Sequence, residues 1–195
     1  MAATKHDEDG YPAELESQLT LAGGRRVRIR ALHTCEAEPI RALYRRLSDT
    51  SRYLRFLSPM PALPDAVVRA LACVDHRRSV ALVAEDARAD AEGRVIGLAG
   101  FSAVEAGAAE VAVVVRDDWQ GRGVGDALVA TLLDAAEARG FHRFVASIAA
   151  DNPAMRKLLA RYGRVVTSEM RFGVSEIAFE PRRPPAARTA SRSAT

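Results

Sequence analysis

The sequence of 195 residues is short of cysteine and histidine, which limits the kinds of site that it can hold. Its only two cysteines, Cys35 and Cys73, lie far apart and outside any C-x-x-C spacing. We therefore expect reduced thiols in a cytoplasmic protein. His33 stands two residues before Cys35, but no second pair of ligands accompanies them. Because a structural metal normally needs four ligands, we expect no metal site.

Long apolar runs are also absent. No stretch reaches the roughly 18 apolar residues that a membrane-spanning helix requires. The first residues, from Lys5 to Asp9, are polar and lack the apolar centre of a signal peptide. These features predict a cytoplasmic protein that has no membrane partner.

Acidic residues are missing from the C-terminal end, where none follows Glu180. Without the four arginines of that end, the formal net charge of +3 falls to −1. The excess positive charge therefore belongs to a tail rather than to a basic face, and we expect no nucleic-acid partner. These arginines are Arg182, Arg183, Arg188 and Arg192.

The composition indicates one domain between two tails. Residues 1–18 are polar and include Gly10 and Pro12, so they predict a flexible N-terminal arm. Residues 181–195 are rich in Pro, Arg, Ala, Ser and Thr, which predicts a disordered tail. The region between them, 19–180, carries most of the hydrophobic residues, which form 48% of the chain and suit a single soluble domain.

Helical and strand patterns alternate through that domain. Short β-branched or apolar runs predict strands at 19–21, 27–32, 80–85, 94–104, 110–116, 144–149 and 174–179. Apolar residues at helical spacing predict helices around 40–47 and at 65–72, 125–139 and 153–162. The sum is an α+β domain in which helices cover a mostly antiparallel sheet.

A glycine-rich turn joins the valine-rich strand to the helix that follows it, and it ends in Gly121, Gly123 and Gly125. Glycines let the backbone curl, and the helix adds its unpaired N–H groups and the positive end of its dipole, so a pyrophosphate fits here. The Walker loop is excluded because Asp126 and Ala127 stand where Lys and Ser/Thr are needed, and the G-x-G-x-G spacing disfavours a dinucleotide fingerprint. An ordinary tight connection is the alternative.

The run from Gln120 to Gly125 resembles the Q/R-x-x-G-x-G/A signature of the GNAT acetyltransferases, and the resemblance extends from about Leu19 to Phe179. Further stretches resemble one subgroup, the bacterial protein lysine acetyltransferases that modify acyl-CoA synthetases. These stretches are Ser51 to Phe56, Val74 to His76, Ala109 to Val115 with Trp119 and Gln120, and Asn152 with Met155.

The resemblance implies a GNAT fold, in which a mixed, mostly antiparallel sheet is flanked by helices and two strands splay around the acyl-CoA site. The splayed strands would be 110–116 and 144–149. Acetyl-CoA is the implied cosubstrate, with its pantetheine arm paired to a strand backbone and its pyrophosphate on the turn. The implied binding residues are Val113, Val114, Val115, Gln120, Gly121, Arg122, Gly123, Val124, Gly125, Asn152 and Arg156. For Arg156, a solvated arginine is an equal alternative.

The same resemblance assigns the chemistry. Glu110 stands where the lysine acetyltransferases carry their catalytic glutamate, and it is the only acid between Gly107 and Val115. It is the expected base, and the N–H of Val113 is the expected donor to the thioester oxygen. The alternative is an inert glutamate at a strand edge. Leu159 occupies the position at which many GNAT enzymes have a tyrosine acid, whereas Tyr162 is expected to serve packing.

The expected acceptor is a lysine of another protein, such as an acyl-CoA synthetase. Two alternatives are a small-molecule amine as acceptor and a non-catalytic module that binds acyl-CoA and acts through a partner. The run that holds Arg52, Tyr53 and Arg55 either contacts an acidic loop of an acceptor protein or forms a packed helix. Nothing in the sequence predicts the oligomeric state.

Overall fold

The computed structural model describes residues 10–90 and 93–182 of the chain. Most of the predicted arm and tail, residues 1–9 and 183–195, lies outside the described residues. The rest of the predicted arm holds a short 3₁₀ turn, η1 (Ala13–Leu15), and the start of the first strand at Ser17. Leu15 is buried in the core, so the described structure begins before Leu19.

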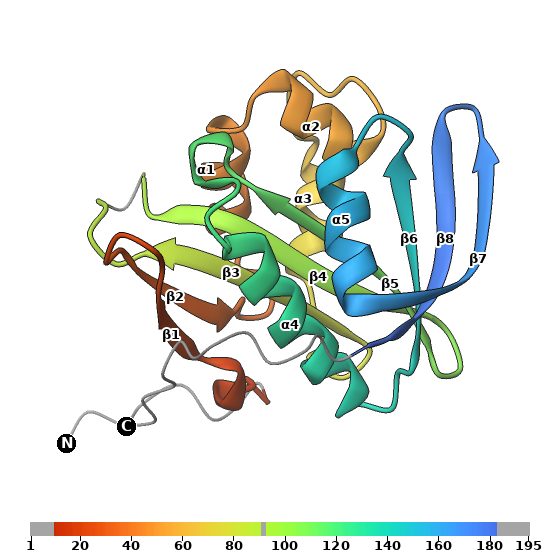
Figure 1. Cartoon of the computed structure of the whole chain (residues 1–195). Helices are drawn as coiled ribbons and strands as arrows, with labels where there is room; N and C mark the ends of the chain where they lie inside the picture. Colours follow the sequence, from red (N-terminus) through yellow and green to blue (C-terminus); the bar gives the residue numbers. More distant parts are fainter. Residues whose placement is uncertain (1–9, 91–92, 183–195) are drawn as a thin grey trace.

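Eight strands form one twisted sheet in the order β1-β2-β3-β4-β5-β6-β8-β7 (Figure 1). Every neighbouring pair is antiparallel except β5 and β6, which run parallel. This arrangement confirms the expected α+β fold with a mixed, mostly antiparallel sheet. The strands are β1 (Ser17–Thr20), β2 (Arg26–Ala31), β3 (Ser79–Asp86), β4 (Val95–Glu105), β5 (Ala108–Val115), β6 (Arg143–Ala149), β7 (Gly163–Arg171) and β8 (Val174–Pro181).

Helices cover both faces of the sheet (Figure 1). Leu128 and Leu132 of α4 and Leu159 of α5 join the larger apolar core on one face. Ile40 and Leu43 of α1 join the second core on the other face, with α3 beside them. The helices are α1 (Glu38–Arg45), α2 (Asp49–Phe56), α3 (Asp65–Ala72), α4 (Val124–Glu137) and α5 (Pro153–Tyr162), with a second 3₁₀ turn, η2 (Asp117–Trp119), before α4.

The run around Arg52 to Arg55 forms the helix α2, which begins at Asp49 after the capping residue Ser48, so the helical alternative for this run is confirmed. The strand β7 was missed altogether, because every residue after Gly163 in it is exposed and its sequence has no alternating pattern. It lies at the edge of the sheet, beside β8.

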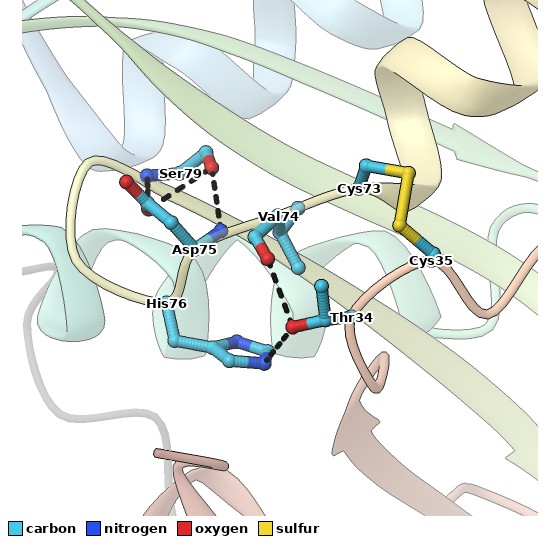
Figure 2. The surroundings of a disulfide bond; sticks show 7 residues. All are labelled: Thr34, Cys35, Cys73, Val74, Asp75, His76 and Ser79. Carbon is cyan, nitrogen blue, oxygen red and sulfur yellow. Dashed lines mark hydrogen bonds between the residues drawn. A yellow bond between two sulfur atoms is a disulfide. The ribbon is translucent and has the colours of Figure 1, made fainter. Parts of the chain in front are cut away.

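Cys35 and Cys73 form a disulfide, which corrects the expectation of reduced thiols (Figure 2). Their Cα atoms are 4.0 Å apart. The fold creates this proximity, because the Cys35 N–H donates to the carbonyl of Ala72 (2.9 Å) and the Thr34 hydroxyl donates to that of Val74 (3.0 Å). The loop before α1 is thus tied to the end of α3. A separation of 38 residues gave no hint of this contact.

Candidate functional site

The parallel strands β5 and β6 pair over only three positions, from Ala108–Arg143 to Glu110–Val145. Beyond Glu110, β5 continues along β4 as far as Val115, but it leaves β6. The predicted splay is therefore present. The Arg116 N–H donates to the Ile96 carbonyl in β4 (2.9 Å). Because the backbone groups of successive residues point to opposite sides of a strand, those of Val113 and Val115 point away from β4, towards the open edge.

A cavity of about 460 Å³ lies along this open edge. Four parts of the chain build it: α2, β5, the glycine-rich turn with the start of α4, and α5 with its cap. The lining residues are Ser51, Leu54, Arg55, Val113, Val114, Val115, Gln120, Gly121, Gly123, Gly125, Asp126, Asn152, Ala154, Met155, Lys157, Leu158 and Arg161.

The glycine-rich turn ends in a helix start that no side chain of the described residues caps. Gly121 and Gly123 have φ angles of 69° and 90°, which L side chains rarely adopt, and Gly123 is the N-cap of α4. Because the first intrahelical bond is made by Ala127, the amides of the first turn remain available to an anion. The turn therefore has the backbone geometry on which the predicted pyrophosphate site depends, and that site stays a prediction.

Two residues of the predicted binding turn lie away from the cavity wall. The guanidinium of Arg122 stands 5.5 Å from the centroid of the Trp119 ring, and Val124 is buried in the core. Neither lines the cavity. The turn therefore offers backbone amides rather than these two side chains.

The helix α5 supplies basic side chains that the sequence analysis did not single out. Lys157 and Arg161 line the cavity, whereas the predicted Arg156 is exposed and does not. Lys157 and Arg161 are four positions apart and therefore lie on one side of the helix, next to Leu158. This spacing is the sequence signal that could have indicated them. Arg161 pairs with Asp126 at the start of α4. Asn152 lines the cavity too, and its Oδ1 caps α5 by accepting a hydrogen bond from the Met155 N–H (3.0 Å).

Gln120 joins the glycine-rich turn to its neighbours through its side-chain amide. Nε2 donates to the Val115 carbonyl (3.0 Å) and to the Ser51 hydroxyl of α2 (3.1 Å). Asp117 reinforces this link, because its carboxylate accepts from the Ser48 N–H (3.0 Å), the Ser48 hydroxyl (2.7 Å) and the Ser51 hydroxyl (2.8 Å). These four residues, the Asp117 cluster, fasten the start of α2 to the turn.

The charge of Asp117 is stabilised within that cluster. Burial acts to raise the pKa of its carboxyl, but the hydrogen bonds from Ser48 and Ser51 outweigh burial and hold the pKa below its ordinary value. Asp117 therefore stays ionised as a second, remote cap of α2.

Glu110, the predicted base, lies at the point where β5 and β6 separate. Its side chain is exposed and is not part of the cavity lining. By strand alternation it points to the same face of the sheet as Val114, and α2 lies beside β5. Its charge acts on the guanidinium of Arg55 in α2, although the two form no ion pair. No described contact assigns Glu110 a role, which stays a prediction.

Leu159 and Tyr162 are both buried in the core beside α4. Neither lines the cavity. The ring of Tyr162 packs in the core, while its hydroxyl also hydrogen-bonds with the Asp126–Arg161 pair of the cavity lining. Leu159 offers no acidic group to a leaving thiol.

Within residues 10–90 and 93–182, no group of three or more His, Cys, Asp or Glu residues could hold a metal ion. Each helix in the same described part is too short or too polar to span a lipid bilayer.

Comparison with known families gives a match to the model of the "Acetyltransferase (GNAT) family" over residues 40–163. An acetyltransferase of Pseudomonas aeruginosa is 35% identical over 147 residues, which cover 75% of this chain and 78% of that protein. The acetyltransferase Pat of Mycolicibacterium smegmatis is 42% identical over 74 residues, but they cover only 37% of this chain and 22% of Pat. An L-methionine sulfoximine/L-methionine sulfone acetyltransferase of P. aeruginosa is 36% identical over 86 residues, covering 42% of this chain and 50% of that protein.

Among solved structures, the GNAT domain of PAT from S. lividans superposes with a TM-score of 0.75 at 32% identity, covering 87% of this chain and 99% of that one. A phosphinothricin acetyltransferase from Sinorhizobium meliloti, solved with acetyl-CoA, gives a TM-score of 0.63 at 19% identity, covering 85% and 90%. The second likeness concerns the fold alone.

Proposed function

Because this chain belongs to the acetyltransferase (GNAT) family and is an acetyl-CoA-dependent acetyltransferase, we propose that it acetylates a lysine of another protein, such as an acyl-CoA synthetase. One observation carries the proposal. The run Ser51 to Phe56, which carries much of the resemblance to the protein lysine acetyltransferases, forms α2 and supplies three residues of the cavity lining. The likeness to the GNAT domain of PAT over nearly all of that domain supports the same subgroup.

The proposed cosubstrate site follows the open edge of β5. The backbone groups of Val113 and Val115 would pair with the amides of the pantetheine arm, as an added strand would. The uncapped amides at the start of α4 would hold the pyrophosphate. Lys157 adds positive charge on the opposite wall, where Arg161 is paired with Asp126. Acetyl-CoA bound in this way supplies the acetyl group as a thioester.

The proposed chemistry assigns one task to each of two residues. A lysine amine with a pKa near 10.4 is protonated at neutral pH, so Glu110 would take its proton, directly or through a water. The exposed position of Glu110 suits a water-mediated transfer. As the neutral nitrogen bonds to the acetyl carbon and the C–S bond breaks, the Val113 N–H would stabilise the negative charge on the carbonyl oxygen. The sulfur departs as thiolate, since Leu159 cannot donate a proton, and the second proton of the nitrogen passes to water or to this thiolate as the amide forms.

A small-molecule amine is the second candidate acceptor. The identity shared with the methionine sulfoximine/sulfone acetyltransferase favours it, although that match covers only half of the relative.

We also propose a cytoplasmic location, because an acyl-CoA synthetase and acetyl-CoA would both be met there.

The test is to incubate the purified protein with acetyl-CoA and an acyl-CoA synthetase, and to map acetylated lysines by mass spectrometry. We expect one dominant lysine whose acetylation depends on the enzyme and exceeds the reaction with acetyl-CoA alone. Methionine sulfone and a polyamine serve as small acceptors in parallel. Turnover of these amines without lysine acetylation would replace the proposal with the second candidate, and binding of coenzyme A without any turnover would indicate a non-catalytic module.

A further inference from the structure

Arg55 differs from the other half-buried arginines of the described chain. Each of the others has a carboxylate within 3.4 Å. They are Arg25, Arg30, Arg41, Arg52, Arg116 and Arg139. The guanidinium of Arg55 instead stands 5.0 Å from the centroid of the Phe56 ring and lines the cavity. Among residues 10–90 and 93–182, no carboxylate forms an ion pair with it and no oxygen accepts a hydrogen bond from it.

The position of Arg55 along the cavity indicates which ligand it faces. Ser51, one helical turn earlier on the same side of α2, is bound to Gln120 of the glycine-rich turn. Arg55 therefore lies farther from that turn, towards Glu110, whose charge acts on it. The pyrophosphate would occupy the end with the uncapped amides. Arg55 thus lies at the other end, where the acceptor amine must enter.

The guanidinium of Arg55 in the cavity wall requires an anionic partner. A guanidinium withdrawn from water is costly unless it is paired, and its planar fork matches a carboxylate with two parallel hydrogen bonds. Burial already lowers the pKa of Arg55, and only the charge of Glu110 opposes this effect. No described residue supplies the missing pair, and the phosphates of the cosubstrate are expected at the glycine-rich turn, so the acceptor is the ligand that we expect to supply an anion beside Arg55.

The geometry points to Arg55 as a specificity residue that binds a carboxylate of the acceptor, on an acidic side chain next to the target lysine. This inference rests on the proposed function and specifies its substrate: a lysine with an Asp or Glu close by. The same chemistry is offered by the α-carboxylate of a free amino acid, and the test separates the two sources.

The test compares two series of lysine pentapeptides, one with Asp and one with Asn at each position beside the lysine. For the wild-type protein we expect kcat/KM to be about ten- to a hundredfold higher for the best Asp peptide than for its Asn partner, as a charge-assisted hydrogen bond would give. Arg55→Gln should remove the difference by lowering only the rate with the Asp peptide. The matched control is Arg46→Gln, which also removes one positive charge but from an exposed position outside the cavity, and it should keep the preference.

The binding of coenzyme A and the thermal midpoint are measured for each variant. Equal rates with Asp and Asn peptides in the wild type would overturn the inference while leaving lysine acetylation in place. A loss of coenzyme A affinity in Arg55→Gln, with the peptide preference retained, would also overturn it and assign Arg55 to the cosubstrate. If methionine sulfone is preferred over its amide and no peptide reacts, the carboxylate belongs to a free amino acid and the proposed function fails instead.

Discussion

The two ends of the proposed site would recognise their ligands in different ways. At the glycine-rich turn, the backbone would do the binding: Gly121 and Gly123 bend the chain, and the first amides of α4 are left without a capping side chain. At the proposed acceptor end, side chains come from separate elements, with Arg55 of α2 in the cavity wall and Glu110 of β5 outside it. The first end depends on a few consecutive residues, whereas the second depends on how α2 is held over the sheet.

The largest expected effect lies at the acceptor end. Glu110→Gln should lower kcat by about a hundred- to ten-thousandfold, because it removes the general base, while the affinity for coenzyme A stays unchanged. Steady-state kinetics with a lysine peptide and calorimetry with coenzyme A measure the two quantities. Glu105→Gln, another exposed carboxylate near the same strands, is the control. Unchanged turnover in Glu110→Gln would remove Glu110 from its proposed role.

The second effect concerns the helices α1 and α3, which pack over the second apolar core. The disulfide closes a loop of 38 residues and ties the end of α3 to the segment before α1. Replacing both Cys35 and Cys73 by Ser should cost about 4 kcal/mol in unfolding free energy by loop entropy, or about 10 °C in Tm. Denaturant titration measures the cost, and a reductant should produce the same loss in the wild type. Alkylation of both cysteines in unreduced wild-type protein would show that the bond is absent in solution.

The third effect isolates the turn. Gly123→Ala should weaken coenzyme A binding by about tenfold, because alanine at φ 90° costs about 1–2 kcal/mol. Gly107→Ala is a matched control, since Gly107 has φ 75° and open space around it, but lies in the turn between β4 and β5. Both variants should lose stability, and calorimetry should show weaker coenzyme A binding in the first alone. Equal affinities would mean that the turn does not shape the binding site.

The smallest effect tests the link between the two ends. Asp117→Asn should reduce stability by about 1 kcal/mol and raise the KM for the peptide, since α2 loses an ionised cap. Because hydrogen bonds hold the pKa of Asp117 below its ordinary value, its contribution is present at neutral pH and is lost as the pH falls through the folded-state pKa. The difference between wild type and variant should therefore vanish in acid. Asp118→Asn removes a neighbouring charge, paired with Arg116, and should leave the KM unchanged.

The sequence predicted the parts of this site that are local and missed those that depend on distant contacts. The turn, the strand before it and the helix after it are consecutive, so the residue pattern indicated all three. The start of α2 depends on Asp117, which is 69 residues from Ser48, and no periodic pattern reveals such a cap. The disulfide was missed for the same reason.

The sequence also did not predict the direction in which individual side chains point. Within the predicted turn, Arg122 lies over Trp119 and Val124 enters the core, although both belong to the signature. All three basic residues of α5 are exposed, but Lys157 and Arg161 line the cavity and the predicted Arg156 does not. The family motif places a segment, but the rotation of each helix decides which of its residues contact a ligand.

The Asp117 cluster has a mechanical consequence. Since Gln120 and Asp117 both grip the first turn of α2, the cosubstrate loop and this helix form one stiff wall that cannot part without breaking several hydrogen bonds. The facing wall is α5, which is held to α4 by the Arg161–Asp126 pair. If the cavity changes shape when ligands bind, we therefore expect α5 to move rather than α2.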